Sequence, residues 1–203
     1  MEKQTKLEAK KATETLVVGS IPAIRRAQID VRIVGLTSLI VHAWSQKALK
    51  EMRDCQQGKA KEKKAPKNPT QEFQDAKYLD DKGRDCVPST AIKSAIIDAA
   101  SFIDGVTKVV IRGAIFVLGE LIPVEYDSCS MREDPVRVGM GKADLRYRPE
   151  YKGWRATFPI EYNPAVISPD QIRNLVNHAG FAIGIGEWRP QKDGQFGRFE
   201  VVV

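Results

Sequence analysis

Cysteine and histidine are scarce in this sequence, which holds three cysteines and two histidines in 203 residues. Cys55, Cys86 and Cys129 are widely spaced and form no C-x-x-C pair, and His42 and His178 fall in different predicted elements. A structural zinc site needs four ligands, usually Cys and His at short spacings. This pattern therefore offers no recognisable zinc motif, and we expect three free thiols, no metal and no cofactor.

Long apolar runs are also missing. No run approaches the roughly 20 residues that a membrane-spanning helix requires. The N-terminal sequence MEKQTKLEAKKATE lacks the apolar stretch of a secretory signal. We therefore expect a cytoplasmic protein with no membrane partner.

Signatures of common catalytic sites are absent too. The sequence contains no GxSxG, no HExxH and no Walker motif. The acidic pairs Asp80-Asp81 and Glu133-Asp134 could bind a metal, but each falls in a polar stretch where exposed side chains and turn residues are more common. We expect a protein that is not an enzyme.

Positive charge exceeds negative charge, giving a formal net charge of +6. Two segments are locally basic: residues 47–67 hold eight Lys or Arg against three Asp or Glu, and residues 132–155 hold seven against four. Such a distribution favours a polyanionic partner such as nucleic acid.

The chain begins with a polar stretch, residues 1–26, which is rich in Lys, Glu and Thr and predicts a mobile arm. Residues 28–42 then alternate, with Ile29, Val31 and Ile33 on one face, which predicts a strand. We expect one domain over residues 27–203.

A basic insertion is expected over residues 43–86, because Lys, Gln, Glu and Asp dominate there. Pro66 and Pro69 interrupt any long helix, so short helices are predicted near residues 46–55 and 71–79. We expect this insertion to project from the domain and to contribute nothing to the core.

A helix is predicted over residues 88–105, followed by a strand or bent hairpin over residues 108–125 that contains Gly113 and Gly119. We expect that second segment to pair with the first strand. The buried face of the helix would hold Ile92, Ile96 and Ala99.

Residues 135–162 again alternate with period two, which predicts a hairpin turning at residues 149–153. Arg146 and Arg148 share a face near that turn, so the hairpin would carry arginines at its tip. The inner face of its second strand would hold Trp154, Ala156, Phe158, Ile160 and Tyr162.

The clearest helix start lies at Ser168, Pro169, Asp170 and Gln171, which together form an N-cap, a first-turn proline, an acidic residue and a capping-box glutamine. A final strand is predicted over residues 198–203. The buried stripe of the helix would hold Ile172, Leu175, Val176 and Ala179.

This order of elements predicts an α+β fold of the ferredoxin-like (RRM-like) type. In that fold a β-α-β-β-α-β unit forms one antiparallel sheet with two helices on one face. Here it would carry a long basic insertion after the first strand and a basic hairpin in the middle.

Residues 184–199, GIGEWRPQKDGQFGRF, combine glycines with aromatic and basic residues. Glycines allow the backbone to approach a ligand closely, basic side chains bind phosphates, and aromatic rings stack on bases. A loop whose Trp188 and Phe196 merely cap the core is an equal alternative. We expect Trp188, Phe196 or Trp154 to provide base stacking.

The sequence resembles the RAMP superfamily, whose ferredoxin-like members include backbone and crRNA-processing subunits of CRISPR effector complexes. The similarity covers residues 27–203. It depends on the first strand with its insertion, on the sequence VPSTAIK at residues 87–93, and on the glycine-rich segment, above all GQFGRF at residues 194–199.

This resemblance implies a subunit that binds single-stranded RNA or DNA along its phosphates, as a homo-oligomer or in a multi-subunit complex. Short proteins of this kind also resemble early proteins of bacteriophages, which would place this one in a bacterial or phage-infected cell. The implied phosphate contacts are Lys93 on the first helix, Arg137, Lys142, Arg146 and Arg148 on the hairpin, and Arg189, Lys192 and Arg198 on the loop.

Two alternatives remain open. Processing members of the superfamily cleave RNA without metal, and His42 is the one acid-base candidate near the corresponding strand. The basic surface could instead dock on an acidic protein partner, as an interaction or inhibitor module.

Overall fold

The computed structural model describes residues 22–59, 66–138 and 141–202. Most of the predicted N-terminal arm, residues 1–21, lies outside the described residues. The described part is a mixed α/β structure built on antiparallel sheets, as the sequence predicts. Within this part, no helix is long and apolar enough to cross a membrane.

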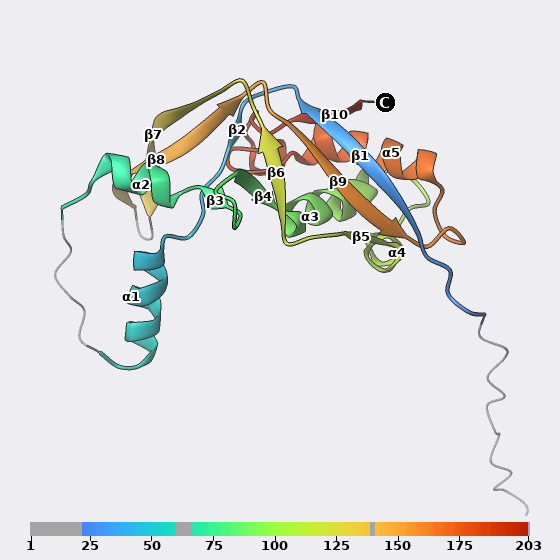
Figure 1. Ribbon diagram of the computed structural model, residues 1–203, viewed down its shortest axis with the longest axis horizontal. Coiled ribbons are helices and arrows are strands. Elements are labelled where there is room, and N and C mark those ends of the chain that lie inside the picture. Colours follow the sequence, from blue (N-terminus) through green and yellow to red (C-terminus); the bar gives the residue numbers. More distant parts are fainter. Residues whose placement is uncertain (1–21, 60–65, 139–140, 203) are drawn as a thin grey trace, which may run out of the picture.

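A seven-stranded antiparallel sheet forms the centre of the structure (Figure 1). Its order is β10-β1-β9-β6-β4-β3, and a short strand, β5, pairs with β9 beside β6. The strands are β1 (Ala27–Gly35), β3 (Tyr78–Leu79), β4 (Asp85–Pro88), β5 (Ile115–Val117), β6 (Leu121–Glu125), β9 (Arg155–Tyr162) and β10 (Phe199–Val202).

Period-two alternation places the apolar residues of β1 and β9 on the inner face of this sheet, as predicted. Val31 and Ile33 are buried on β1. The whole predicted inner face after the turn is buried, and it comprises Trp154, Ala156, Phe158, Ile160 and Tyr162.

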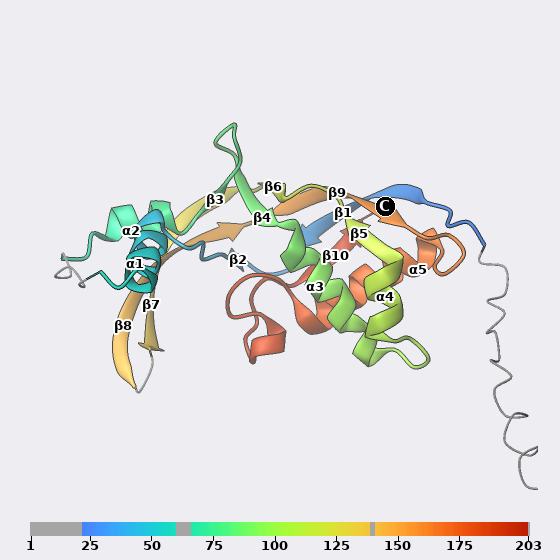
Figure 2. The ribbon, with the colours of Figure 1, turned by 90° about the horizontal axis from the view of Figure 1, so that it is seen from below.

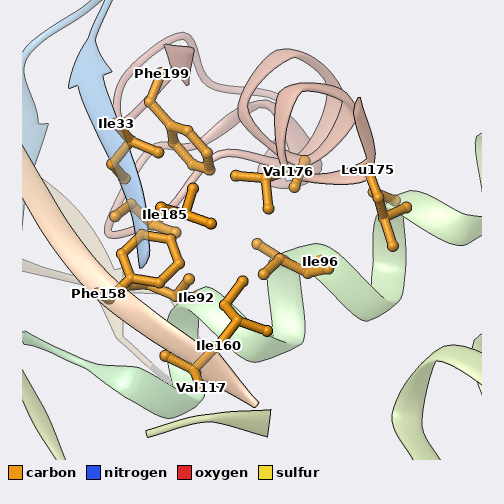
Figure 3. Close-up of a cluster of buried hydrophobic side chains, with 14 of the residues drawn as sticks. Ile33, Ile92, Ile96, Val117, Phe158, Ile160, Leu175, Val176, Ile185 and Phe199 are labelled. Atoms are coloured by element: carbon orange, nitrogen blue, oxygen red, sulfur yellow. The ribbon is translucent and has the colours of Figure 1, made fainter. Parts of the chain in front are cut away.

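Three helices cover one face of the sheet: α3 (Ser89–Ala99), α4 (Lys108–Ala114) and α5 (Pro169–His178) (Figure 2). In the core between helices and sheet, Ile92 and Ile96 of α3, Leu175 and Val176 of α5 and Phe158 of β9 belong to one buried cluster (Figure 3). The predicted capping box is present, because Ser168 Oγ accepts from the Gln171 amide at 3.3 Å and Gln171 Oε1 accepts from the Ser168 amide at 2.9 Å.

A long hairpin of β7 (Ser128–Val138) and β8 (Lys142–Lys152) extends from the sheet on the side that carries α1 (Gln46–Gln56) and α2 (Pro69–Asp75) (Figure 1). β2 (Leu39–Ile40) pairs with β8 and completes a second, three-stranded sheet. This hairpin and its sheet form a unit distinct from the main sheet.

The prediction for residues 108–125 was wrong in part. Thr107 accepts a hydrogen bond from the Val110 amide at 3.3 Å and so caps α4, which contains Gly113. The strands β5 and β6 follow, but they pair with β9 and β4 and not with β1. Local apolar content did not distinguish a short capped helix from a strand.

The hairpin prediction also needs correction. A turn is present at Gly153, where φ is +60°, but it joins β8 to β9, which pair with different strands. Arg146 and Arg148 therefore lie inside β8 and not at a tip. The hairpin tip falls between Val138 and Lys142 instead.

The insertion, residues 43–86, is not wholly separate from the core. The predicted helix at residues 46–55 is confirmed as α1, which buries none of its residues. However, α2 ends at Asp75, and the chain then enters the main sheet, where Asp85 and Cys86 are buried in β4. The polar composition concealed this strand.

Candidate nucleic-acid interface

An open cleft of about 590 Å³ lies where β7 of the hairpin meets the glycine-rich loop, residues 184–199. We call it the hairpin–loop cleft. Figure 2 shows the loop between the hairpin and α3. The cleft is lined by Thr37, Arg132, Asp134, Pro135, Trp188, Gly194, Gln195 and Phe196.

A buried carboxylate organises the hairpin side of the cleft. Asp134 is 4% exposed and accepts from Arg132 Nε at 2.7 Å and from Arg148 Nη1 at 3.3 Å. Arg148 also faces Glu187 of the loop, with Nη2 3.7 Å from the carboxylate. Because residues 132 and 148 are paired across the strands, both arginines are on the same face as Asp134.

The loop side of the cleft is aromatic. Trp188 Nε1 donates to Asp134 Oδ2 at 3.3 Å, which joins the loop to the hairpin. The Phe196 amide donates to the Trp188 carbonyl at 3.0 Å. Across the cleft, the guanidinium of Arg132 lies 4.8 Å from the centre of the Phe196 ring, which is the geometry of a cation–π contact.

The loop glycines serve the packing of the loop itself. Gly186 (φ +79°) lies against the Ile40 carbonyl, and Gly197 (φ +67°) lies against the Ile185 carbonyl, so a Cβ at either position would collide with backbone. The Gly197 amide also donates to the Ser38 carbonyl at 2.8 Å. At these two positions, the glycine allows the loop to pack closely against the chain's own backbone and not, as expected, against a ligand.

Four predicted phosphate contacts lie on the two elements that form this cleft, but none lines it, and Arg189 instead lines a second cleft with residues of α3. Arg137 and Lys192 are exposed, and neither forms an ion pair with another described residue. Arg189 donates to the Gly186 carbonyl at 2.9 Å, and Arg198 lies 5.2 Å from the centre of the Phe181 ring.

The other predicted cations are placed differently. Arg146 Nε lies 3.2 Å from Asp144, so part of its charge is compensated. Lys142 begins β8, and its side chain falls outside the described part. Lys93 lies over Phe116 at 3.9 Å on α3 and does not line the hairpin–loop cleft.

Two predicted nucleic-acid contacts, Trp154 and Arg148, are wrong because both side chains are buried. Trp154 is fully buried and donates from Nε1 to the Thr37 carbonyl at 2.8 Å, so its ring offers no face to a base. Arg148 is 7% exposed and committed to Asp134 and Glu187, so it holds the hairpin to the loop and is not exposed to a phosphate.

Arg132, Asp134 and Thr37 were not among the predicted site residues. Asp134 had been interpreted as a solvated or turn residue, whereas it is a buried strand residue. The only sequence signal was the spacing of Arg132 and Asp134, two residues apart in an alternating segment, which places them on one face. Asp80, in contrast, is a turn residue as predicted, and accepts from the Arg84 amide at 2.9 Å.

His42, the candidate acid-base residue, lies beside the ion pair of Arg148 and Glu187 and not in the cleft lining. Its Nδ1 is buried without a hydrogen-bond partner among the described residues. Burial lowers the pKa of His42 below its usual value, and the nearby Arg148 lowers this pKa further, while Glu187 opposes both.

A second buried carboxylate anchors the base of the hairpin. Asp85 of β4 accepts from Tyr126 at 2.6 Å and from Tyr151 of β8 at 2.9 Å, and it lies 3.3 Å from Lys77 of the insertion. The hydrogen bond to Asp85 raises the pKa of Tyr126 to about 12. Among the residues that the structure describes, no group of three or more His, Cys, Asp or Glu is placed to hold a metal ion.

Comparisons with known proteins identify the fold. No protein-family model matches the chain, and a search of curated proteins gives no match. The structure is similar to a chain of the Type III-B Cmr-beta bound to cognate target RNA, with a TM-score of 0.51 and 11% sequence identity. That alignment covers 88% of this chain and 60% of the other.

Two other solved structures align over similar lengths. Cmr6 from Pyrococcus furiosus aligns over 89% of this chain and 100% of its own, with 10% identity and a TM-score of 0.45. A Cas6 product complex aligns over 86% of this chain and 51% of its own, with 9% identity and a TM-score of 0.31. At 11% identity, the alignment with the Cmr-beta chain shows a similar fold and no more.

Proposed function

We propose that this protein binds single-stranded RNA along the phosphate backbone, across the surface formed by the β7–β8 hairpin and the glycine-rich loop. The observation that carries this proposal is the hairpin–loop cleft, where Arg132 meets the aromatic residues Trp188 and Phe196 between two elements that carry further exposed cations. Phosphates would meet the cations while bases face the aromatic surface.

The distribution of unpaired charge supports a polyanion as the ligand. Arg137 of β7 and Lys192 of the loop are exposed, so both elements that form the cleft carry an exposed cation, although neither residue lines the cleft. Arg189 and Arg198 add positive charge to the same loop. Because such contacts release counterions, we expect the affinity to fall steeply with salt.

The fold supports RNA as the ligand and a larger assembly as the setting. Elements β1, α3, β5, β9, α5 and β10 follow the order of a ferredoxin-like β-α-β-β-α-β unit, with β10, β1, β9 and β5 adjacent in the sheet. The similar Cmr-beta structure is bound to cognate target RNA. We propose that this chain is likewise one subunit of a multi-subunit complex on RNA.

We propose that the strand is held and not cleaved. His42, the residue considered for metal-independent cleavage, does not line the hairpin–loop cleft. Incubating the protein with labelled RNA in the presence of a chelator tests this point. Intact RNA is the expected result, and cleavage that disappears in His42→Ala would establish a nuclease instead.

The main test compares two double variants with equal changes in charge. Arg137→Gln/Lys192→Gln removes two exposed cations, one from the hairpin and one from the loop. Arg26→Gln/Arg173→Gln removes one cation just before β1 and one from α5, each in an ion pair, at the opposite end of the structure (Figure 1). Affinity for a single-stranded oligoribonucleotide is measured over a series of salt concentrations.

We expect the first double variant to weaken binding and to reduce the slope of log affinity against log salt by about 1.4 for single-stranded RNA. The second should leave the slope within error of wild type. Equal slopes for wild type and both variants would show that the phosphates do not cross this surface.

A further inference from the structure

We propose that the hairpin–loop cleft holds one unpaired base of the bound strand, stacked on Trp188 next to the Arg132–Phe196 pair, and that it accepts different pyrimidines equally well. This inference rests on the proposed function and specifies how the same site engages the strand. It concerns the base, whereas the proposed function depends on the phosphates.

Trp188 and Phe196 are the aromatic residues of the cleft lining. Both line the cleft, and the hydrogen bond from the Phe196 amide to the Trp188 carbonyl, at 3.0 Å, keeps their backbones side by side. Arg132 adds a planar guanidinium 4.8 Å from the Phe196 ring centre. Aromatic rings and guanidinium planes are the surfaces on which single-stranded bases stack.

The position of Trp188 is held at a cost in backbone energy. Its φ of 53° lies in the left-handed region, which a bulky residue rarely adopts, yet its side chain remains 40% exposed. Two contacts keep it there: the indole donates to buried Asp134, and Gly194 packs against the Trp188 backbone where a Cβ would collide. A strained backbone that presents a large exposed ring is typical of binding sites.

The size and setting of the cleft suit a base. Its volume of about 590 Å³ lies within the range of small-molecule sites, about 300–1,000 Å³. The loop that forms one wall also carries Arg189, Lys192 and Arg198, which would attract the phosphates on either side of a stacked base.

Most polar groups of the lining are already committed, which is why we expect no discrimination between pyrimidines. Asp134 accepts from Arg132, Arg148 and Trp188. Thr37 Oγ1 accepts from the Arg198 amide at 3.1 Å. The exposed amide of Gln195 can both donate and accept, so it can serve the edge of either cytosine or uracil.

The experiment uses the full chain and three short oligoribonucleotides of equal length: oligouridine, oligocytidine and an abasic strand with the same phosphates. We expect wild type to bind oligouridine and oligocytidine within about threefold of each other, and the abasic strand about tenfold more weakly. In Trp188→Ala, all three should bind with the affinity that wild type has for the abasic strand.

Two further variants separate stacking from folding. Trp188→Phe keeps an aromatic ring but loses the N–H group, and we expect it to bind oligouridine more tightly than the abasic strand. Trp44→Ala removes a tryptophan that is 67% exposed outside the cleft, and it should retain the wild-type difference.

The outcomes distinguish this inference from the proposed function. Salt-dependent binding that is equally tight for the base-bearing and abasic strands would overturn the base pocket and leave the phosphate interface intact. A Trp188→Ala variant that kept the wild-type preference for bases would also overturn it. If no strand bound at low salt, both proposals would fail, and the cleft would be assigned to a protein partner.

Discussion

The main sheet with its helices and the joint between hairpin and loop are held together in different ways. The first is apolar: Ile33, Ile92, Phe158, Ile160 and Ile172 are all fully buried. The second depends on charge, because Asp134 and Arg148 are buried as an ion pair and Trp188 donates a hydrogen bond to Asp134. The candidate site is therefore built on a polar joint that lies outside the apolar core.

The largest effect should come from the apolar core. Phe158→Ala removes a fully buried ring between α3 and the sheet, and we expect a loss of about 4 kcal/mol in the free energy of unfolding. Denaturant titration followed by circular dichroism measures it. Phe181, which is 69% exposed, provides the control, because Phe181→Ala should change stability far less. Equal losses would contradict the assignment of the core.

Breaking the joint should have the next largest effect. Asp134→Ala leaves Arg148 buried without its main partner, which we expect to cost about 3 kcal/mol. Glu125→Ala removes a carboxylate that is 73% exposed in its ion pair with Arg155, so it should cause little change.

Hydrogen exchange should locate the Asp134→Ala effect. We expect faster exchange in β7, β8 and the loop, while the amides of β1 and β9 keep their protection. Loss of protection across the whole sheet would mean that the joint and the core form one cooperative unit.

These two regions also differ in how far the sequence predicts them. The capping box at Ser168 and the alternation from Trp154 to Tyr162 predict α5 and β9 correctly. A capping box is a local signal, and an apolar strand face is buried against the core. The partners of Asp134 could not be predicted, because its ion pair with Arg148 and its hydrogen bond from Trp188 depend on the tertiary fold. Trp154 differs, because the alternation already placed it on the inner face of its strand, where its ring is buried, and its assignment to the site was wrong.

Loop glycines provide a finer comparison. Gly197→Ala places a Cβ against the Ile185 carbonyl at a φ of +67°, whereas Gly83→Ala meets nothing within 4 Å at a φ of +74°. We expect Gly83→Ala to cost about 1 kcal/mol from backbone conformation alone. Gly197→Ala should cost about 2 kcal/mol or more and weaken RNA binding as well. Thermal and denaturant unfolding measure the difference, and equal costs would show that the loop tolerates the added methyl group.

The smallest effect concerns pH. The pKa of His42 is lowered in the folded protein by burial and by Arg148, so the unfolded chain takes up this proton first as the pH falls. Stability should therefore decrease as the pH drops below about 6.5, the ordinary histidine value, toward the lowered pKa. His42→Asn should remove this part of the pH dependence, and His178→Asn, at an exposed position, should retain it. Identical profiles for wild type and His42→Asn would contradict the burial of this ring.

Ultraviolet cross-linking of RNA followed by mass spectrometry of the peptides tests most directly whether the hairpin and the loop form the RNA surface. The cross-links should lie within residues 128–138, 141–152 and 184–199, with Trp188 and Phe196 among the modified positions, and they should disappear at high salt. Cross-links confined to α4 and α5, or persisting unchanged at high salt, would contradict the account.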